Sequence, residues 1–214
     1  MTFTAERLRL DDLINSCDRA LRALFGVNKC SRPNPSIGAS ESKLSEHERA
    51  HVSGLMRINH TGEICAQALY EGQALLARTP EAKASLLDAA EEESDHLSWC
   101  RSRLDELNAA PSLLNPLFYS ASFAIGAVAG AFGDRVSLGF VEATEDEVVH
   151  HIRKHLKVLP EKDEKSRRIL EAMRVDEERH AAEALQRGGI EFPKPVKRLM
   201  RTISRVMTET TYRI

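Results

Sequence analysis

Acidic residues on the apolar faces of helices are the feature that most limits what this chain can fold into. Between residues 134 and 159, apolar side chains recur at the period of a helix that turns one face toward a core. Glu145 falls within this stripe, whereas its acidic neighbours Glu142 and Glu147 fall outside it. A carboxylate that faces a core is costly unless it is protonated or bound to a cation. The stripe therefore predicts a helix with a functional acid on its buried face. Its apolar members are Leu138, Val141, Val148, Ile152, Leu156 and Leu159.

Two Glu-x-x-His pairs carry the same signal. Glu93 and His96 form one pair, and Glu177 and His180 form the other. Residues three apart on a helix project from one face, so each carboxylate and imidazole can reach a single cation. Either pair alone could be a solvated surface, but both glutamates share a stripe with apolar residues. These are Leu86, Ala89, Cys100, Leu104 and Leu107 around the first pair, and Leu170, Met173 and Ala184 around the second.

The chain repeats this arrangement in two halves. Glu63 lies in an apolar stripe and precedes Glu93 by 30 residues, and Glu145 precedes Glu177 by 32. Each half is expected to form a helical hairpin, with one glutamate on its first helix and a Glu-x-x-His pair on its second. Ferritin-like di-metal proteins have this ligand pattern, so the sequence predicts an all-α, ferritin-like four-helix bundle. The six expected metal ligands are Glu63, Glu93, His96, Glu145, Glu177 and His180.

This ligand set favours iron or manganese. Zinc takes fewer ligands with more nitrogen or sulfur, and calcium and magnesium avoid histidine. In the expected arrangement Glu93 and Glu177 bridge two metal ions, the other two glutamates are terminal ligands, and each histidine holds one ion. Asp95 and Asp176 are candidates to accept hydrogen bonds from the imidazole N–H groups. Exposed helix charge is an equal alternative for both aspartates.

The remaining histidines near these motifs permit more than one interpretation. His60 lies three residues before Glu63 and is either a seventh ligand or a hydrogen-bonded core histidine, which is the favoured reading. His150, His151 and His155 form a cluster after Glu145. His151 could carry protons near the site, because histidine titrates near neutrality, or it could serve packing alone.

Composition limits the classes of partner. The 214 residues include 30 basic and 32 acidic side chains, for a net charge of −2, so nucleic acid is not an expected partner. The four cysteines include no C-x-x-C pair, which argues against a disulfide framework or a zinc cluster, and Cys65 and Cys100 are expected in the core. Residues 1–12 carry charges throughout, so no secretory signal is expected there.

Capping and turn signals divide the chain into two parts. Residues 1–44 are expected to form an N-terminal amphipathic helix and a loop rich in Pro, Gly and Ser, and residues 45–214 the metal-binding domain. Ser45 and Glu48 have the spacing of a capping box at the start of this domain. Helices are expected over 5–25, 46–78, 80–109, 134–159, 161–187 and 194–209.

The stretch from Asn108 to Gly133 contains no charged residue. It has about the length of a transmembrane span, but its many small and polar residues make it weakly hydrophobic. One expectation is a buried crossover helix between the two hairpins. The other is a helix that lies in a membrane surface or lines an apolar substrate channel, and the residues alone do not separate the two.

The motifs resemble those of the demethoxyubiquinone hydroxylase family. The resemblance covers about residues 45–214, and the motifs occur in the order and spacing of that family. They are Arg-Ile-Asn-His-Thr-Gly-Glu at 57–63, Glu-Ser-Asp-His at 93–96, Thr-Glu-Asp at 144–146, Asp-Glu-Glu-Arg-His at 176–180, Val-Met-Thr at 206–208 and Thr-Tyr-Arg-Ile at 211–214.

The resemblance implies a di-iron monooxygenase that hydroxylates the ring of a demethoxyubiquinol precursor with O₂, using the same six ligands. An external reductant is then needed, and the absence of a G-x-G-x-x-G motif leaves a partner protein, NADH or the quinol itself as its source. The prenylated substrate resides in the bilayer, and residues 194–209 alternate basic and apolar side chains, as suits an anionic membrane surface. We therefore expect a peripheral protein on the cytoplasmic side of the inner membrane. A homo-oligomer or a ubiquinone-biosynthesis complex is left open.

Two rival functions use parts of the same pattern. A ferritin- or rubrerythrin-like protein that handles iron or peroxide would share the six ligands, but it would not account for the uncharged stretch of 26 residues. A metal-free helical scaffold would leave Glu145 unexplained within its apolar stripe.

Overall fold

The computed structural model describes residues 10–26, 30–40 and 43–214, and within these ranges it contains seven helices and no strand. The predicted all-α fold is confirmed. The first nine residues lie outside the described ranges, and so does the expected start of the first helix. The helices are α1 (Leu10–Phe25), α2 (Glu46–Leu75), α3 (Pro80–Glu106), α4 (Asn115–Ala131), α5 (Asp134–Val158), α6 (Glu164–Gln186) and α7 (Lys194–Thr211).

Local signals set most helix ends. Ser45 and Glu48 form the expected reciprocal capping box at the start of α2. The prediction that α2 reaches residue 78 is wrong, because the helix ends at Leu75. The backbone N–H groups of Arg78 and Thr79 donate to Asp134 just before α3 begins. The prediction that α3 reaches residue 109 is also wrong, since Asn108 takes a left-handed conformation with φ of 57° that ends the helix.

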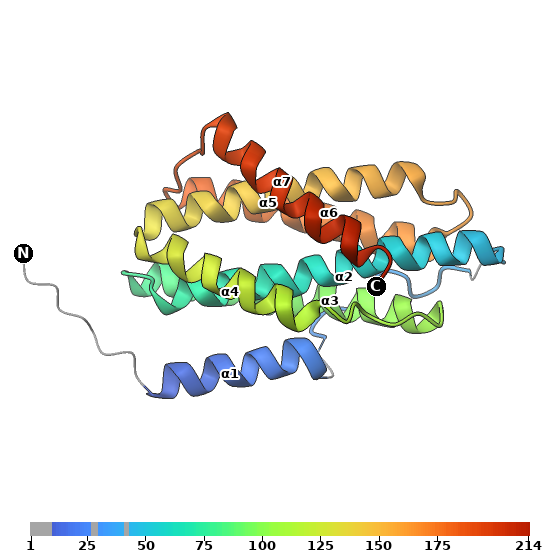
Figure 1. The fold of residues 1–214 in the computed structure, drawn as a ribbon, viewed down its shortest axis with the longest axis horizontal. Helices are drawn as coiled ribbons and strands as arrows, with labels where there is room; N and C mark the ends of the chain where they lie inside the picture. Colours follow the sequence, from blue (N-terminus) through green and yellow to red (C-terminus); the bar gives the residue numbers. More distant parts are fainter. Residues whose placement is uncertain (1–9, 27–29, 41–42) are drawn as a thin grey trace, which may run out of the picture.

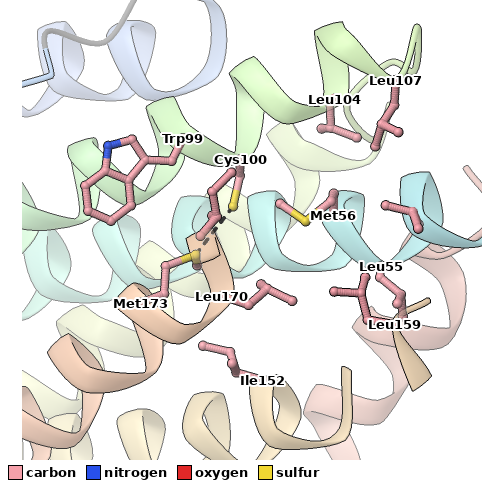
Figure 2. Packing of buried hydrophobic residues seen from close by; sticks show 12 residues of the cluster. Leu55, Met56, Trp99, Cys100, Leu104, Leu107, Ile152, Leu159, Leu170 and Met173 are labelled. Carbon is pink, nitrogen blue, oxygen red and sulfur yellow. Dashed lines mark hydrogen bonds between the residues drawn. The ribbon is translucent and has the colours of Figure 1, made fainter. Parts of the chain in front are cut away.

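Helices α2, α3, α5 and α6 form a four-helix bundle made of two hairpins, α2–α3 and α5–α6, and α4 crosses between them (Figure 1). Two apolar clusters fill the bundle at different levels along its axis. Figure 2 shows the first, where Cys100 of α3 contacts Met173 of α6 at a sulfur–sulfur distance of 3.7 Å. The second includes Tyr70, Leu86 and Val141. The gap between the clusters is the level at which all four predicted glutamates occur.

The uncharged stretch forms a helix that packs closely on α2. A Cβ atom added to Gly72 of α2 would lie 2.2 Å from the carbonyl oxygen of Phe123, and one added to Gly126 of α4 would lie 2.2 Å from that of Leu69. Only glycine allows the two backbones to approach this closely. The buried-crossover expectation is confirmed for this face of α4, while Leu117 and Val128 on another face are exposed. Within the described residues, no helix has the length and apolar character needed to cross a membrane.

The terminal helices lie outside the bundle. Helix α7 runs along α2 and α5, and its end is held where the Tyr212 hydroxyl lies 2.7 Å from Nδ1 of His51 (Figure 1). Arg57 donates to the carbonyl oxygen of Tyr212. Helix α1 contacts α2 and α4, yet its apolar residues Ile14 and Phe25 are exposed. The boundary at residue 44 stays a prediction.

Candidate metal centre

Four helices bring the six predicted residues together at the middle of the bundle. They form two overlapping groups, one of Glu63, Glu93, His96 and Glu177, and one of Glu93, Glu145, Glu177 and His180. Within each group, one potential ligand atom per residue lies within 4.8 Å of the others, and all six residues are buried. Glu93 and Glu177 belong to both groups, which is the placement that a bridging carboxylate requires.

Both imidazoles turn the same nitrogen toward the carboxylates. Nδ1 of His96 lies 2.9 Å from Glu93 and 3.0 Å from Glu177. Nδ1 of His180 lies 3.3 Å from Glu93 and 3.2 Å from Glu177. Glu63 is 3.6 Å from Nδ1 of His96. The i, i+3 spacing of each pair produces this convergence, since both members project from one face of α3 or α6.

Charge and burial strongly perturb the pKa values of the group. Burial raises the pKa of Glu63 and of Glu145 well above the ordinary glutamate range, and the charge of Glu177 raises both further. Burial disfavours the charged form of His180, but its hydrogen bonds to Glu177 and Glu93 outweigh this and raise its pKa to about 12. Without a cation, the site therefore retains protons that a metal would displace.

The donor set fits a pair of divalent cations. Neither carboxylate oxygen of Glu145 has a hydrogen-bond partner among the described residues, although the side chain is 1% exposed. An unpaired buried carboxylate is costly, and a metal ion would compensate it. Four ionised carboxylates carry four negative charges, which two divalent cations would neutralise. Oxygen and imidazole donors without sulfur suit iron or manganese.

Each imidazole also has an outer carboxylate, and it comes from the opposite helix. Nε2 of His96 on α3 lies 2.9 Å from Asp176 on α6. Nε2 of His180 on α6 lies 3.0 Å from Glu92 on α3. A carboxylate that accepts the Nε2–H proton leaves Nδ1 free as a metal donor. The expected role of Asp176 agrees with this geometry.

Sequence reasoning missed Glu92. A signal was present, because both motifs have an acidic residue directly before the glutamate of the Glu-x-x-His pair: Glu92 before Glu93, and Asp176 before Glu177. The signal identifies the acid, but only the packing of α3 against α6 shows that each acid reaches the histidine of the other helix.

The expected role of Asp95 as an imidazole acceptor is wrong. Its carboxylate is buried and accepts hydrogen bonds from the backbone N–H and hydroxyl of Ser31 and from Nε of Arg32. Asp95 points toward the loop that follows α1. The side chain therefore ties this loop to α3.

The other histidines lie outside the two groups. His60 is buried, burial lowers its pKa to about 4, and its Nδ1 has no hydrogen-bond partner among the described residues. It is neither a member of the metal groups nor the hydrogen-bonded core histidine that was favoured. Nδ1 of His155 lies 3.1 Å from the amide nitrogen of Asn59, and His151 lies 3.2 Å from Glu147.

An apolar cavity of about 420 Å³ adjoins the centre. Glu63 is part of its wall, and the other walls come from α2, α4, α5 and α7. Ile125 of α4 and Ile203 of α7 line it and are also exposed, so it opens between these two helices. Cys65 lines it too, so the expectation of simple core packing holds for the buried Cys100 but not for Cys65. A second face of α4 therefore lines an apolar cavity, and its use as a substrate channel stays a prediction.

The chain is similar to known proteins over most of its length. The model of the family described as ubiquinone biosynthesis protein COQ7 matches residues 50–211. A protein of Azotobacter vinelandii named 3-demethoxyubiquinol 3-hydroxylase is 58% identical over 205 residues, which cover 95% of each chain. A protein of the same name from Ralstonia pickettii is 56% identical, over 96% of this chain and 100% of its own. The chain therefore belongs to the COQ7 family of ubiquinone biosynthesis proteins.

Proposed function

We propose that this protein is a di-iron monooxygenase that hydroxylates the ring of a demethoxyubiquinol precursor in ubiquinone biosynthesis. The observation that carries the proposal is the position of the buried Glu/His cluster beside an apolar cavity, with Glu63 common to both. An iron-storage protein would need the cluster but not the cavity. The names of the relatives support the same reaction.

In this proposal two iron ions would supply the activation of O₂, and Glu93 and Glu177 would be ligands common to both. Glu63 and Glu145 would each add one carboxylate, and His96 and His180 would each add one imidazole nitrogen, Nδ1. The electrons come from outside the chain, with NADH as one candidate donor. Membership of both ligand groups supports the bridging roles, and the outer carboxylates support the imidazole tautomers.

The chain's own contribution to the reaction is to bind and orient the quinol. The apolar walls of α4 and α7 accept the ring and the first part of the prenyl tail, and they exclude water from the side of Glu63. Glu147 and His151 line both this cavity and a neighbouring polar recess. Nε2 of His151 lies 3.2 Å from Glu147, and in this proposal the pair would hydrogen-bond a ring hydroxyl and take up its proton.

Complementation tests the proposed reaction. The gene is expressed in cells that lack their own demethoxyubiquinone hydroxylase, and quinones are measured by mass spectrometry. Wild type is expected to restore ubiquinone, Glu177→Ala to leave the demethoxy precursor, and Glu171→Ala, an exposed acid on the same helix, to behave as wild type. Accumulated precursor despite good expression of the wild type would refute the assignment.

We further propose that the protein is peripheral to the membrane, on the cytoplasmic side of the inner membrane. Both helices at the cavity mouth expose apolar side chains, among them Leu117, Val128 and Phe132 at α4 and Leu199 and Val206 on α7. The basic residues of α7 lie beside them and suit anionic headgroups.

Flotation with vesicles tests this location. Wild type is expected to float with phosphatidylethanolamine–phosphatidylglycerol vesicles and less with phosphatidylcholine alone. The double variant Phe132→Ser/Leu199→Ser should float poorly, whereas Val175→Ser, an exposed residue on α6, should not differ from wild type. Equal flotation of all three proteins would contradict docking through α4 and α7.

A further inference from the structure

The loop after α1 contacts the candidate metal centre from outside the bundle. Ser31 donates to Asp95 through its backbone N–H at 2.6 Å and through its hydroxyl at 2.8 Å. Nε of Arg32 donates to the same carboxylate at 2.9 Å. These contacts join positions 63 or 64 residues apart in the sequence. They fix Ser31 and the guanidinium of Arg32 against α3.

The guanidinium of Arg32 then spans from α3 to α6. Its Nη1 lies 2.8 Å from Asp176, at the same carboxylate oxygen that lies 2.9 Å from Nε2 of His96. Nη2 of Arg32 also lies 3.3 Å from Nε2 of His96, so the guanidinium contacts both the imidazole and the oxygen that accepts its proton. A planar guanidinium can donate to two carboxylates at fixed angles, which a lysine ammonium cannot do.

An aromatic ring completes the enclosure of this side chain. The guanidinium carbon lies 4.9 Å from the centre of the Trp99 ring, and that ring lies 5.2 Å from the His96 imidazole. Two carboxylates and one ring thus limit the guanidinium to one orientation. Asp176 is held in turn, since its oxygen is shared between Arg32 and His96.

Among the described residues, no arginine from outside the bundle contacts the outer carboxylate of His180. Its outer carboxylate, Glu92, pairs with Arg179, which neighbours His180 on α6 and is 42% exposed. Arg179 therefore lies on α6, the helix that also carries the candidate ligands Glu177 and His180. Among the described residues both outer carboxylates have Arg179 nearby, and Asp176 has in addition Arg32 from the loop after α1.

We propose that Arg32 is a positioning residue that orients Asp176, so that His96 keeps its proton on Nε2 and presents Nδ1 to the metal. The inference rests on the proposed function, because it assumes that His96 is a ligand. It makes the 30–32 segment part of the metal centre. The iron held by His96 should depend on this segment, and the iron held by His180 should not.

Metal retention by the full-length protein tests the inference. Wild type, Arg32→Ala, Arg32→Lys and the surface control Arg168→Ala are loaded anaerobically with ⁵⁷Fe(II), and release to a chelator is followed. Loss of an outer partner of a metal-bound histidine weakens binding about 10–100-fold. For Arg32→Ala we expect one of the two irons to leave at least tenfold faster and only one Mössbauer doublet to change. Arg32→Lys should be intermediate, and Arg168→Ala should match wild type.

The outcomes are distinguishable from a failure of the proposed function. Unchanged release in Arg32→Ala, or equal acceleration of both irons together with a lower Tm, would overturn the positioning role. Wild type that binds two irons but does not hydroxylate the quinol would overturn the function alone. Wild type that binds no iron would overturn both.

Discussion

Single residues at the centre differ in function although their burial is similar. Glu142, Glu145 and Glu147 are all at most 8% exposed, yet only Glu145 belongs to a metal group. The other two are paired with cations of α7: Glu142 with Lys197 at 2.6 Å and Glu147 with Arg201 at 2.8 Å. An acid without a paired cation is the one that a metal ion would stabilise.

Iron stoichiometry tests this difference at Glu145. Glu145→Gln removes a charged donor, so we expect iron content to fall from about two per chain to about one or less. Asp146→Asn, which changes the exposed neighbour on the same helix, should retain both irons. Iron content measured by atomic absorption after anaerobic loading decides the question. Full loading of Glu145→Gln would show that Glu145 is not a ligand.

His155 offers a second test at the residue scale. Burial lowers its pKa to about 4, below the value of about 6.5 in an unfolded chain. The neutral form is therefore favoured on folding, and its contribution is present above pH 6.5 and lost as the pH falls toward 4. Two and a half pKa units correspond to on the order of 3 kcal/mol. Wild type should lose about that much more unfolding free energy than His155→Gln over this range, measured by urea denaturation. Parallel curves would contradict the shift.

At the scale of elements, the position of α4 depends on the close approach of its backbone to that of α2. Helix α4 lies on α2 at glycine positions, and the same helix lines the cavity through Phe118 and Ser122. Close packing of α4 on α2 thus places one wall of the cavity beside Glu63. The tight contact positions the substrate pocket relative to the centre.

Two glycines of α2 provide a matched test. A Cβ at Gly72 would collide with backbone of α4, whereas a Cβ at Gly62 would meet nothing within 4 Å. We expect Gly72→Ala to cost about 1–3 kcal/mol of unfolding free energy through overpacking. Gly62→Ala should be neutral or stabilising by about 0.5–1 kcal/mol, because alanine favours the helix. Thermal and urea denaturation measure both, and equal effects would contradict the close contact of α2 with α4.

At the scale of the whole molecule, the helices form two layers, the four-helix bundle and a cover made of α4 and α7. The four-helix bundle carries the candidate ligands, while α4 and α7 cover it and form the mouth of the cavity. Ion pairs from α5 and the Tyr212 contacts at the C-terminus hold α7 in this cover. The candidate ligands therefore come from the bundle alone, whereas the cavity has walls from both the bundle and its cover.

A substitution that blocks the cavity tests whether substrate binding can be changed without a change in metal binding. Ala121 and Ala124 lie one turn apart on α4 and are both exposed, but only Ala121 lines the cavity. Ala121→Trp should raise KM for a prenylated demethoxyquinol about tenfold, or about 1.4 kcal/mol of binding, with iron content unchanged. Ala124→Trp should retain the wild-type KM. A normal KM in Ala121→Trp would show that the substrate uses another route.

The sequence by itself determined most of the helices and the apolar stripes that contain the six candidate ligands. Helical periodicity is local, so the stripe around Glu145 and the i, i+3 pairs at His96 and His180 could be predicted without a fold. Helix ends near Leu76 and Asn108 were missed, because a distant carboxylate and a left-handed residue decide them.

Only the tertiary structure decided which side chains meet across helices. Glu92 and Asp176 each contact the histidine of the opposite helix, and Arg32 contacts Asp176. Helix α7 covers Glu142 and Glu147. All of these contacts join residues that are far apart in the sequence. Periodicity identifies the face on which a residue lies but not the element that covers that face. The grouping of the six candidate ligands and the partner role of Asp176 were therefore predictable, whereas the contacts of Glu92 and Arg32 were not.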